Sequence, residues 1–324
     1  MKKLYIISKH ILYNVGGAEK SILKYASDLK YDYKFLLGFK FITKNLNKKT
    51  GYLFEFLEVK LNINKFYFFE YYINKRVIKQ QISYLKDVHI ITYGIYFPVI
   101  INSSKTCFNE LHIRSETDLG IFINYNTGLK YFVKFFLQLI EFPFNFFYQR
   151  ELSKAIHRAD KVVCNSKFMK KELYRLFKKD SVVEYPCIEI DLNGFKSTKE
   201  GIVFIGDSKI KGLNLVQEIA RRMPEHTFYV FGRDTYIETK VINIVYCPWQ
   251  KNVLDIYKRA KLVIVPSLWK EAYGRVAKEA VLLNLPVLVS DIGGLKEAVN
   301  YDKTKLVTNY KNSDEWISRI KDII

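Results

Sequence analysis

Residues 262–284 constrain the fold of this chain more than any other stretch. The apolar run Leu262–Val265 is closed by a Pro-Ser pair, which predicts a buried parallel strand followed by a loop. Apolar residues then recur at helical spacing, which predicts a helix over Tyr273–Asn284 with Gly274 at or just before its first turn. A buried strand that leads through a loop into a helix is the repeating unit of an α/β fold.

Two carboxylates lie in this stretch, eight positions apart. We expect Glu271 in the loop and Glu279 on the body of the helix. Exposed N–H groups at the start of the helix could bind a hydroxyl or phosphate placed between the two carboxylates. The alternative for an isolated pair is a surface helix with ordinary glutamates.

The composition limits the class of protein. With 324 residues, 49% of them hydrophobic, the chain can form two domains of ordinary size. Its four cysteines are scattered, which argues against a zinc site or a disulfide framework and fits a reducing cytosol. We expect neither a signal peptide nor a transmembrane helix, because no apolar run is long enough.

Strand and helix patterns alternate along the whole chain, so a domain boundary has to be placed by composition. Residues 186–200 form an irregular linker between two such series, which predicts domains at 1–185 and 201–324. The strands expected from apolar runs are Lys3–Ser8, Lys34–Phe39, Tyr52–Val59, Val88–Thr92, Lys105–Asn109, Asp160–Ser166, Val182–Tyr185, Ile202–Gly206, Phe228–Phe231, Ile242–Tyr246 and Pro286–Ser290.

Several residues at strand ends are candidates for ligand contact. Gly16 and Gly17 follow the first strand, where glycine lets backbone N–H groups approach a phosphate or sugar. His112 is expected just past the strand Lys105–Asn109, where open α/β sheets place ligand-contacting groups, although a structural histidine is equally compatible. Neither a dinucleotide-binding nor a P-loop pattern is present.

The block from Leu254 to Val299, which contains Glu271-x(7)-Glu279, resembles the signature of retaining glycosyltransferases of family 4. The resemblance implies the GT-B fold, in which two doubly wound Rossmann-like domains face each other across a cleft. It also implies transfer of a sugar from a nucleotide-diphospho-sugar to a glycan or lipid-linked acceptor, as in surface polysaccharide synthesis. Asn284 stands where the family usually has glycine, a mild departure because asparagine tolerates a left-handed helix end.

The same resemblance implies roles for individual residues. Glu279 would hold the ribose, Glu271 the donor sugar, and Lys211 the diphosphate, which itself takes the proton from the acceptor as it leaves. Asp207 stands where the family usually has arginine, so Lys209 is the candidate for the second charge. The implied catalytic residues are Glu271, Lys211 and His112; the donor-binding residues are Glu279, Gly274, Tyr273, Arg275, Lys209, Gly206, Gly232 and Cys247; and the acceptor loop holds Gly16 and Gly17.

The chain contains no Asp-x-Asp pattern, so we expect no cofactor and no essential metal. The alternatives are a sugar-nucleotide-binding protein without turnover, suggested by Asp207, and a phosphorylase-like enzyme, which the short chain disfavours. A basic nucleic-acid-binding module is the least supported alternative, because no recognition motif accompanies the charge.

The net charge of +19 is unevenly placed, with +16 in residues 1–180 and +3 in the rest. Residues 122–158 mix aromatic side chains with lysine and arginine, a composition that suits an anionic membrane surface. The alternatives are a composition bias and a helical hairpin packed on the first domain, with Pro143 as a break or kink. We expect a cytoplasmic protein, peripheral on the membrane if this contact exists.

Overall fold

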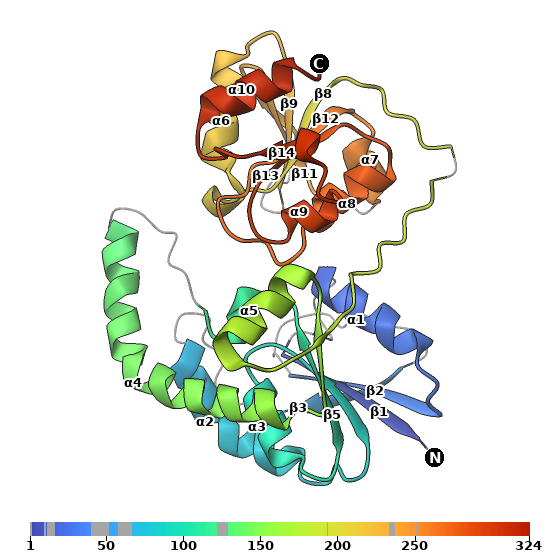
Figure 1. Ribbon diagram of the computed structural model, residues 1–324, viewed down its shortest axis with the longest axis vertical. Helices are drawn as coiled ribbons and strands as arrows, with labels where there is room; N and C mark the ends of the chain where they lie inside the picture. The colour runs from blue at the N-terminus through green and yellow to red at the C-terminus, as the bar shows by residue number, and fades with distance from the viewer. Residues whose placement is uncertain are drawn as a thin grey trace. The chain divides into compact units, whose positions relative to one another are not determined.

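The computed structural model describes residues 2–9, 11, 17–39, 52–57, 67–121, 129–192, 194–232, 237–250 and 252–324. The chain divides into two compact units, Met1–Cys187 and Ile188–Ile324. Each unit is an α/β domain built on its own sheet (Figure 1).

The sheet of the first unit is parallel, in the order β3-β2-β1-β4-β5-β6-β7. The central strand β4 is buried at every position, including its polar ends His89 and Thr92, as expected for a parallel strand with both faces covered. The strands are β1 Lys3–Ile7, β2 Tyr33–Phe39, β3 Leu53–Leu57, β4 His89–Thr92, β5 Phe108–Ile113, β6 Lys161–Cys164 and β7 Val182–Val183.

Helices lie in the described connections between these strands, and α2, α3 and α4 pack against one another (Figure 1). Ser166 caps α5 by accepting a hydrogen bond from the Met169 N–H at 3.0 Å. Helix α4 continues through Pro143 and changes direction along its length, so proline does not end it. The helices are α1 Gly17–Asp28, α2 Tyr67–Gln81, α3 Phe97–Ser103, the 3₁₀ turn η1 Glu116–Leu119, α4 Leu129–Arg158 and α5 Lys167–Phe177.

The sheet of the second unit has the order β10-β11-β9-β8-β12-β13-β14 and is parallel except for the edge strand β10. Its strands are β8 Gly201–Ile205, β9 Phe228–Gly232, β10 Thr239–Val241, β11 Ile244–Pro248, β12 Ala260–Val265, β13 Val287–Ser290 and β14 Leu306–Val307. Its helices are η2 Lys209–Lys211, α6 Leu213–Arg222, α7 Val253–Tyr257, α8 Arg275–Leu282, α9 Leu295–Ala298, η3 Lys303–Lys305 and α10 Ser313–Lys321.

Both faces of this second sheet are covered. Val203 of β8 faces a core shared with α7, α8 and α9, whereas its neighbours Ile202 and Phe204 face a core shared with α6 and α10. Successive side chains of a strand point to opposite faces, so one apolar strand supplies both cores. This is the doubly wound arrangement that the sequence predicted.

Strands β8 and β12 are neighbours in the sheet. The strand that follows each of them in sequence lies on its outer side: β9 lies next to β8, and β13 lies next to β12. The loops that leave the carboxyl ends of β8 and β12 therefore diverge. Open α/β sheets bind ligands at such a topological switch point. The two loops here are residues 206–212 and 266–274.

Two strands were predicted at the wrong positions along the sequence. The expected strand Lys105–Asn109 is displaced, because residues 105–107 form the turn after α3 and β5 runs from Phe108 to Ile113. Glu110 and His112 therefore lie inside the strand rather than past its end. These polar residues can occupy a buried strand because they are two apart, lie on the same face and hydrogen bond to each other at 2.9 Å.

The expected strand Ile242–Tyr246 begins two residues too early. Ile242 and Asn243 form the turn of a hairpin between β10 and β11, and Ile242 has φ 56°. The sequence prediction missed β10 because its side chains are exposed and its pattern has no apolar face.

Candidate functional site

Lys211 and Glu271 meet at the switch point of the second sheet. Lys211 ends η2 after β8, Glu271 lies in the loop after β12, and the Lys211 Nζ donates to Glu271 Oε1 at 2.8 Å. The Ser267 hydroxyl donates to the same oxygen. The Lys211 ammonium also lies 5.5 Å from the ring centroid of Trp269. A cation is therefore held at this point by a carboxylate and an aromatic face.

Close backbone contacts hold the two loops together. The Leu268 N–H donates to the Ile210 carbonyl at 2.9 Å. Gly212 has φ 95°, and a Cβ there would lie 2.2 Å from the Pro266 carbonyl oxygen. Only glycine permits this approach, so the Lys-Gly pair both presents the Lys211 cation and lets the loops touch.

Glu279 projects from α8 and is buried, with both carboxylate oxygens engaged. The Tyr257 hydroxyl donates to Oε2 at 2.9 Å, and Arg275 donates to Oε1 at 3.4 Å from one turn earlier. Burial and the Glu279 charge raise the pKa of Tyr257 well above its ordinary value, so its hydroxyl remains a donor. The Glu279 carboxylate is thereby oriented before any ligand arrives.

Helix α8 begins at Gly274, which has φ 98° and no side chain to cap the first-turn N–H groups. A Cβ at this position would lie 2.5 Å from Leu295 Cδ2. The preceding Tyr273 is buried. The sequence correctly placed Gly274 at the start of the helix, and Asn284 has φ 54°, the left-handed end that the sequence predicted.

The remaining donor-side candidates lie at nearby strand ends. Gly206 follows β8, and a Cβ on it would lie 2.9 Å from Lys211 Cβ, so it borders the Lys211 side chain. Gly232 ends β9 and borders Asp207 in the same way, at 2.8 Å from its Cβ. Lys209 is exposed on η2.

Cys247 is buried, and its thiol lies 3.6 Å from Glu238 Oε2. Burial raises the pKa of this thiol to about 12, so it stays protonated. The Cys247 side chain therefore serves packing, and only its backbone is left for ligand contact.

His112 lies in the first unit with its ring fully buried. Its Nδ1 accepts from Arg114 at 2.8 Å, so the ring proton is on Nε2, which donates to Glu110 at 2.9 Å. Burial lowers the pKa of His112 to about 4, although the hydrogen bond to Glu110 acts in the opposite direction and raises it. We expect a neutral histidine with a structural role.

Glu110 joins His112 to a second histidine. Burial alone would raise the Glu110 pKa, but hydrogen bonds from His112 and His89 hold that pKa well below its ordinary value. His89 Nε2 lies 3.0 Å from Glu110 Oε2. Sequence reasoning missed this network because its members come from neighbouring strands.

The acceptor-loop candidates are only partly described. Gly17 is the first residue of α1 rather than part of the loop before it. Gly16 lies outside the described residues, as do Phe122–Gly128 and the side chains of residues 129–140.

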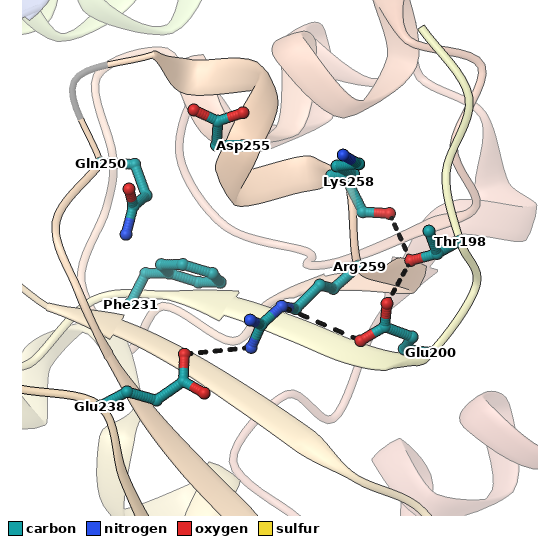
Figure 2. Close-up of a pocket in the computed structure, with 8 residues that line it drawn as sticks. All are labelled: Thr198, Glu200, Phe231, Glu238, Gln250, Asp255, Lys258 and Arg259. Carbon is teal, nitrogen blue, oxygen red and sulfur yellow. Dashed lines mark hydrogen bonds and ion pairs between the residues drawn. The ribbon is translucent and has the colours of Figure 1, made fainter.

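A pocket of about 450 Å³ lies in the second unit (Figure 2). Figure 2 shows Arg259 between Glu238, at 3.1 Å, and Glu200, at 3.9 Å. The lining of this pocket includes neither Lys211 nor the two motif glutamates. The lining residues are Thr198, Glu200, Phe231, Glu238, Gln250, Asp255, Lys258 and Arg259.

Within the described part of the chain, no group of three or more histidine, cysteine, aspartate or glutamate side chains is placed to hold a metal ion. No described helix is both long enough and apolar enough to cross a membrane.

The fold is that of the GT-B glycosyltransferases. The whole chain superposes on sucrose-phosphate synthase from Thermosynechococcus elongatus with a TM-score of 0.70, covering 90% of that chain at 14% identity. HepE from Anabaena, solved in complex with UDP, aligns with 99% of this chain and 89% of its own, at a TM-score of 0.68 and 14% identity.

The family-model match lies in the second unit. Residues 232–324 match the family model of glycosyl transferases group 1. A D-inositol 3-phosphate glycosyltransferase of Mycobacteroides abscessus is 21% identical over 203 residues, which are 53% of this chain and 46% of that protein. The chain thus spans less than half the length of this relative.

Proposed function

We propose that this protein is a retaining glycosyltransferase that moves a sugar from a nucleotide-diphospho-sugar to a glycan or lipid-linked acceptor. The observation that carries the proposal is the contact of Lys211 with Glu271 at the switch point, one loop away from the oriented carboxylate of Glu279. The match of residues 232–324 to glycosyl transferases group 1 supports it, because this range contains both glutamates.

The proposed donor contacts follow from charge and hydrogen-bonding capacity. Glu279 accepts hydrogen bonds from the two ribose hydroxyls, and Glu271 accepts from hydroxyls of the sugar. The N–H groups at the start of α8, over Tyr273–Arg275, donate to sugar or phosphate oxygens. HepE binds UDP and UDP-glucose in its solved complexes, which is consistent with a nucleotide-sugar donor here.

In the proposed mechanism, the bond between the sugar and the diphosphate breaks as the acceptor hydroxyl attacks from the face that the diphosphate leaves. Lys211 neutralises the negative charge that grows on the departing diphosphate. The leaving phosphate oxygen takes the proton from the acceptor hydroxyl, so no side chain is required as the base. We propose that this chemistry needs no essential metal, and undiminished turnover in the presence of a chelator is the expected result.

The acceptor and the pathway are further proposals. A glycan in surface polysaccharide or glycoconjugate synthesis fits the class of enzyme. A lipid-linked acceptor would be presented at the cytoplasmic membrane face, which suits the basic residues 1–180.

Asp207 favours one alternative, a protein that binds sugar nucleotides without turnover. It is exposed beside Gly232, at the position where the resemblance to family 4 implies an arginine, and a carboxylate there repels a diphosphate. Asp207→Arg should raise turnover if the wild-type protein is a weakened enzyme.

The test of the proposed function is a thermal-shift screen of UDP-, GDP- and ADP-sugars. A ligand that binds only the folded state raises the unfolding temperature, so one nucleotide series should stabilise the protein. Hydrolysis or transfer of the stabilising donor then separates the enzyme from the binding protein. Absence of stabilisation by every nucleotide sugar would contradict both.

A further inference from the structure

The exposed side of helix α4 is aromatic where a surface helix is normally polar. Phe142, Phe146 and Phe147 are 66%, 52% and 53% exposed. Pro143 and Arg150 are exposed between and beside them. At about 3.6 residues per turn, these five positions fall on one side of the helix. Three phenylalanines gathered on one face indicate a binding surface rather than scattered apolar residues.

The opposite side of α4 is anchored to the first unit. Tyr148 and Leu152 are fully or almost fully buried, and the Tyr148 hydroxyl donates to the Ile95 carbonyl at 3.1 Å. Glu141 is buried as well and accepts from the Phe68 N–H at 2.8 Å. The inner side therefore holds the helix in place, so its exposed phenylalanines are presented on a supported surface.

The charge on the exposed side has one sign. Arg150, Lys154 and Arg158 are exposed toward the C-terminal end of α4, and the exposed positions between 142 and 158 include no carboxylate. The Arg150 guanidinium lies 4.7 Å from the ring centroid of Phe146, so cation and ring occupy the same part of the surface.

We propose that this exposed side of α4, residues 142–158, is the surface through which the protein binds an anionic lipid bilayer. Phenylalanine rings enter the boundary between headgroups and acyl chains, while arginine and lysine remain at the level of the anionic headgroups. The net charge of +16 in residues 1–180 attracts the same surface over a longer range. The proposal rests on the proposed function only in naming a lipid-linked acceptor; lipid binding itself is independent of the reaction.

The first test is sedimentation with vesicles of phosphatidylcholine alone and of phosphatidylcholine mixed with phosphatidylglycerol. The wild-type protein should bind the anionic vesicles, bind the neutral ones weakly and release the anionic ones in high salt. The triple variant Phe142→Ser, Phe146→Ser, Phe147→Ser should lose roughly tenfold or more in vesicle affinity. Arg150→Glu with Lys154→Glu should also weaken binding, and only at low salt.

The matched control replaces exposed aromatic residues elsewhere on the first unit. Tyr84 and Tyr174 are 54% and 55% exposed, so Tyr84→Ser with Tyr174→Ser removes similar rings from other surfaces. This control should bind vesicles like the wild-type protein. Circular dichroism and thermal unfolding of every variant, measured without vesicles, show whether each is folded. Stabilisation by a nucleotide sugar tests the proposed function separately.

A fluorescent side chain gives a direct readout of insertion. The native tryptophans, Trp249, Trp269 and Trp316, all lie in the second unit. The emission of Phe146→Trp should shift to shorter wavelength on anionic vesicles, and that of Tyr174→Trp should not.

Equal vesicle affinity of the triple variant and the wild-type protein would overturn the proposal. So would light scattering that shows a wild-type dimer and a monomeric triple variant, because α4 would then be an interface between copies of the chain. Vesicle binding without any nucleotide-sugar binding would support the membrane-binding proposal and contradict the proposed function.

Discussion

The ammonium of Lys211 already has an anionic partner in the structure. Glu271, which also accepts a hydrogen bond from Ser267, lies beside Lys211, at the position where the Lys211 charge would attract an incoming phosphate. A diphosphate donor therefore has to compete with or share this contact. Because Lys211 is only one-third exposed, its charge acts in an environment of lowered dielectric, where a phosphate interaction is stronger than in water.

We predict that Lys211→Ala reduces turnover more than it reduces affinity for the bare nucleoside. The charge on the diphosphate grows as the sugar bond breaks, so Lys211 stabilises the transition state more than the bound donor. Steady-state kinetics and calorimetry with the nucleoside measure the two effects. Lys209→Ala on the same turn tests the second charge, and an unchanged turnover would make Lys209 a surface lysine. Equal losses of turnover and nucleoside affinity with Lys211→Ala would contradict the assignment.

Glu279→Gln should lower donor affinity about tenfold or more. The change removes a charge-assisted hydrogen bond worth about 1.5–3 kcal/mol and keeps the side-chain shape. Calorimetric titration with the stabilising nucleotide sugar measures the loss, and Glu225→Gln, at an exposed position of the same unit, should have no effect. Unchanged affinity in Glu279→Gln would remove Glu279 from the ribose site.

His112→Gln should make stability less dependent on pH. The folded pKa of about 4 lies below the value of about 6.5 for an unfolded histidine, so acid favours the unfolded chain. The contribution of neutral His112 is complete above pH 6.5 and is lost as the pH falls toward 4. Urea unfolding at pH 7 and pH 5 should show the wild-type protein losing about 2 kcal/mol more than the variant. Equal losses would mean that the ring is charged in the fold.

At the scale of elements, the site depends on where strands end and helices begin. The loops after β8 and β12 diverge because their following strands lie outward on opposite sides, and glycine lets these loops touch. Helix α8 begins at Gly274, directly after the loop that carries Glu271. The start of α8 thus fixes the distance between the two motif carboxylates.

Gly274→Ala should destabilise the protein by about 2–4 kcal/mol, because it adds a contact at 2.5 Å with Leu295 to the cost of a positive φ. Gly194→Ala is the matched control, since Gly194 also has positive φ but a Cβ there would meet nothing within 4 Å. Denaturant unfolding of both variants measures the difference. A Gly274→Ala variant no less stable than Gly194→Ala would show that Leu295 moves away at little cost.

At the scale of the molecule, each unit has a sheet and a core of its own. The second unit has separate cores on the two faces of its sheet, and the first has a core around β1, β4 and α1. Units with separate cores can unfold as separate cooperative transitions. A ligand that binds one unit then stabilises that unit against unfolding more than it stabilises the other.

We therefore predict that a bound nucleotide sugar protects the second unit more than the first. Hydrogen exchange followed by mass spectrometry should show slower exchange over residues 206–212 and 266–282. The buried network around Glu110 in the first unit should be unaffected and serves as the internal control. Uniform protection of both units would contradict a donor site confined to the second.

Local patterns in the sequence determined much of this structure. Alternating apolar strands and amphipathic helices predicted two α/β domains, and the start of α8 at Gly274 and the left-handed Asn284 were predicted from single residues. These features depend on neighbours within a few positions, where steric and hydrogen-bonding preferences act directly. The motif glutamates were singled out by the resemblance of the surrounding block to a known family, and their proposed roles stay a prediction.

The tertiary structure decided what depends on distant residues. Glu110 and His112 lie inside β5, where Glu110 hydrogen bonds with His112 on its own strand and with His89 on β4, so His112 is buried rather than at a strand end. The contact of Lys211 with Glu271 required strands β8 and β12 to become neighbours. Local preferences contain no information about which strands pair; burial of the complete sheet selects that order, and with it the residues that meet at the site.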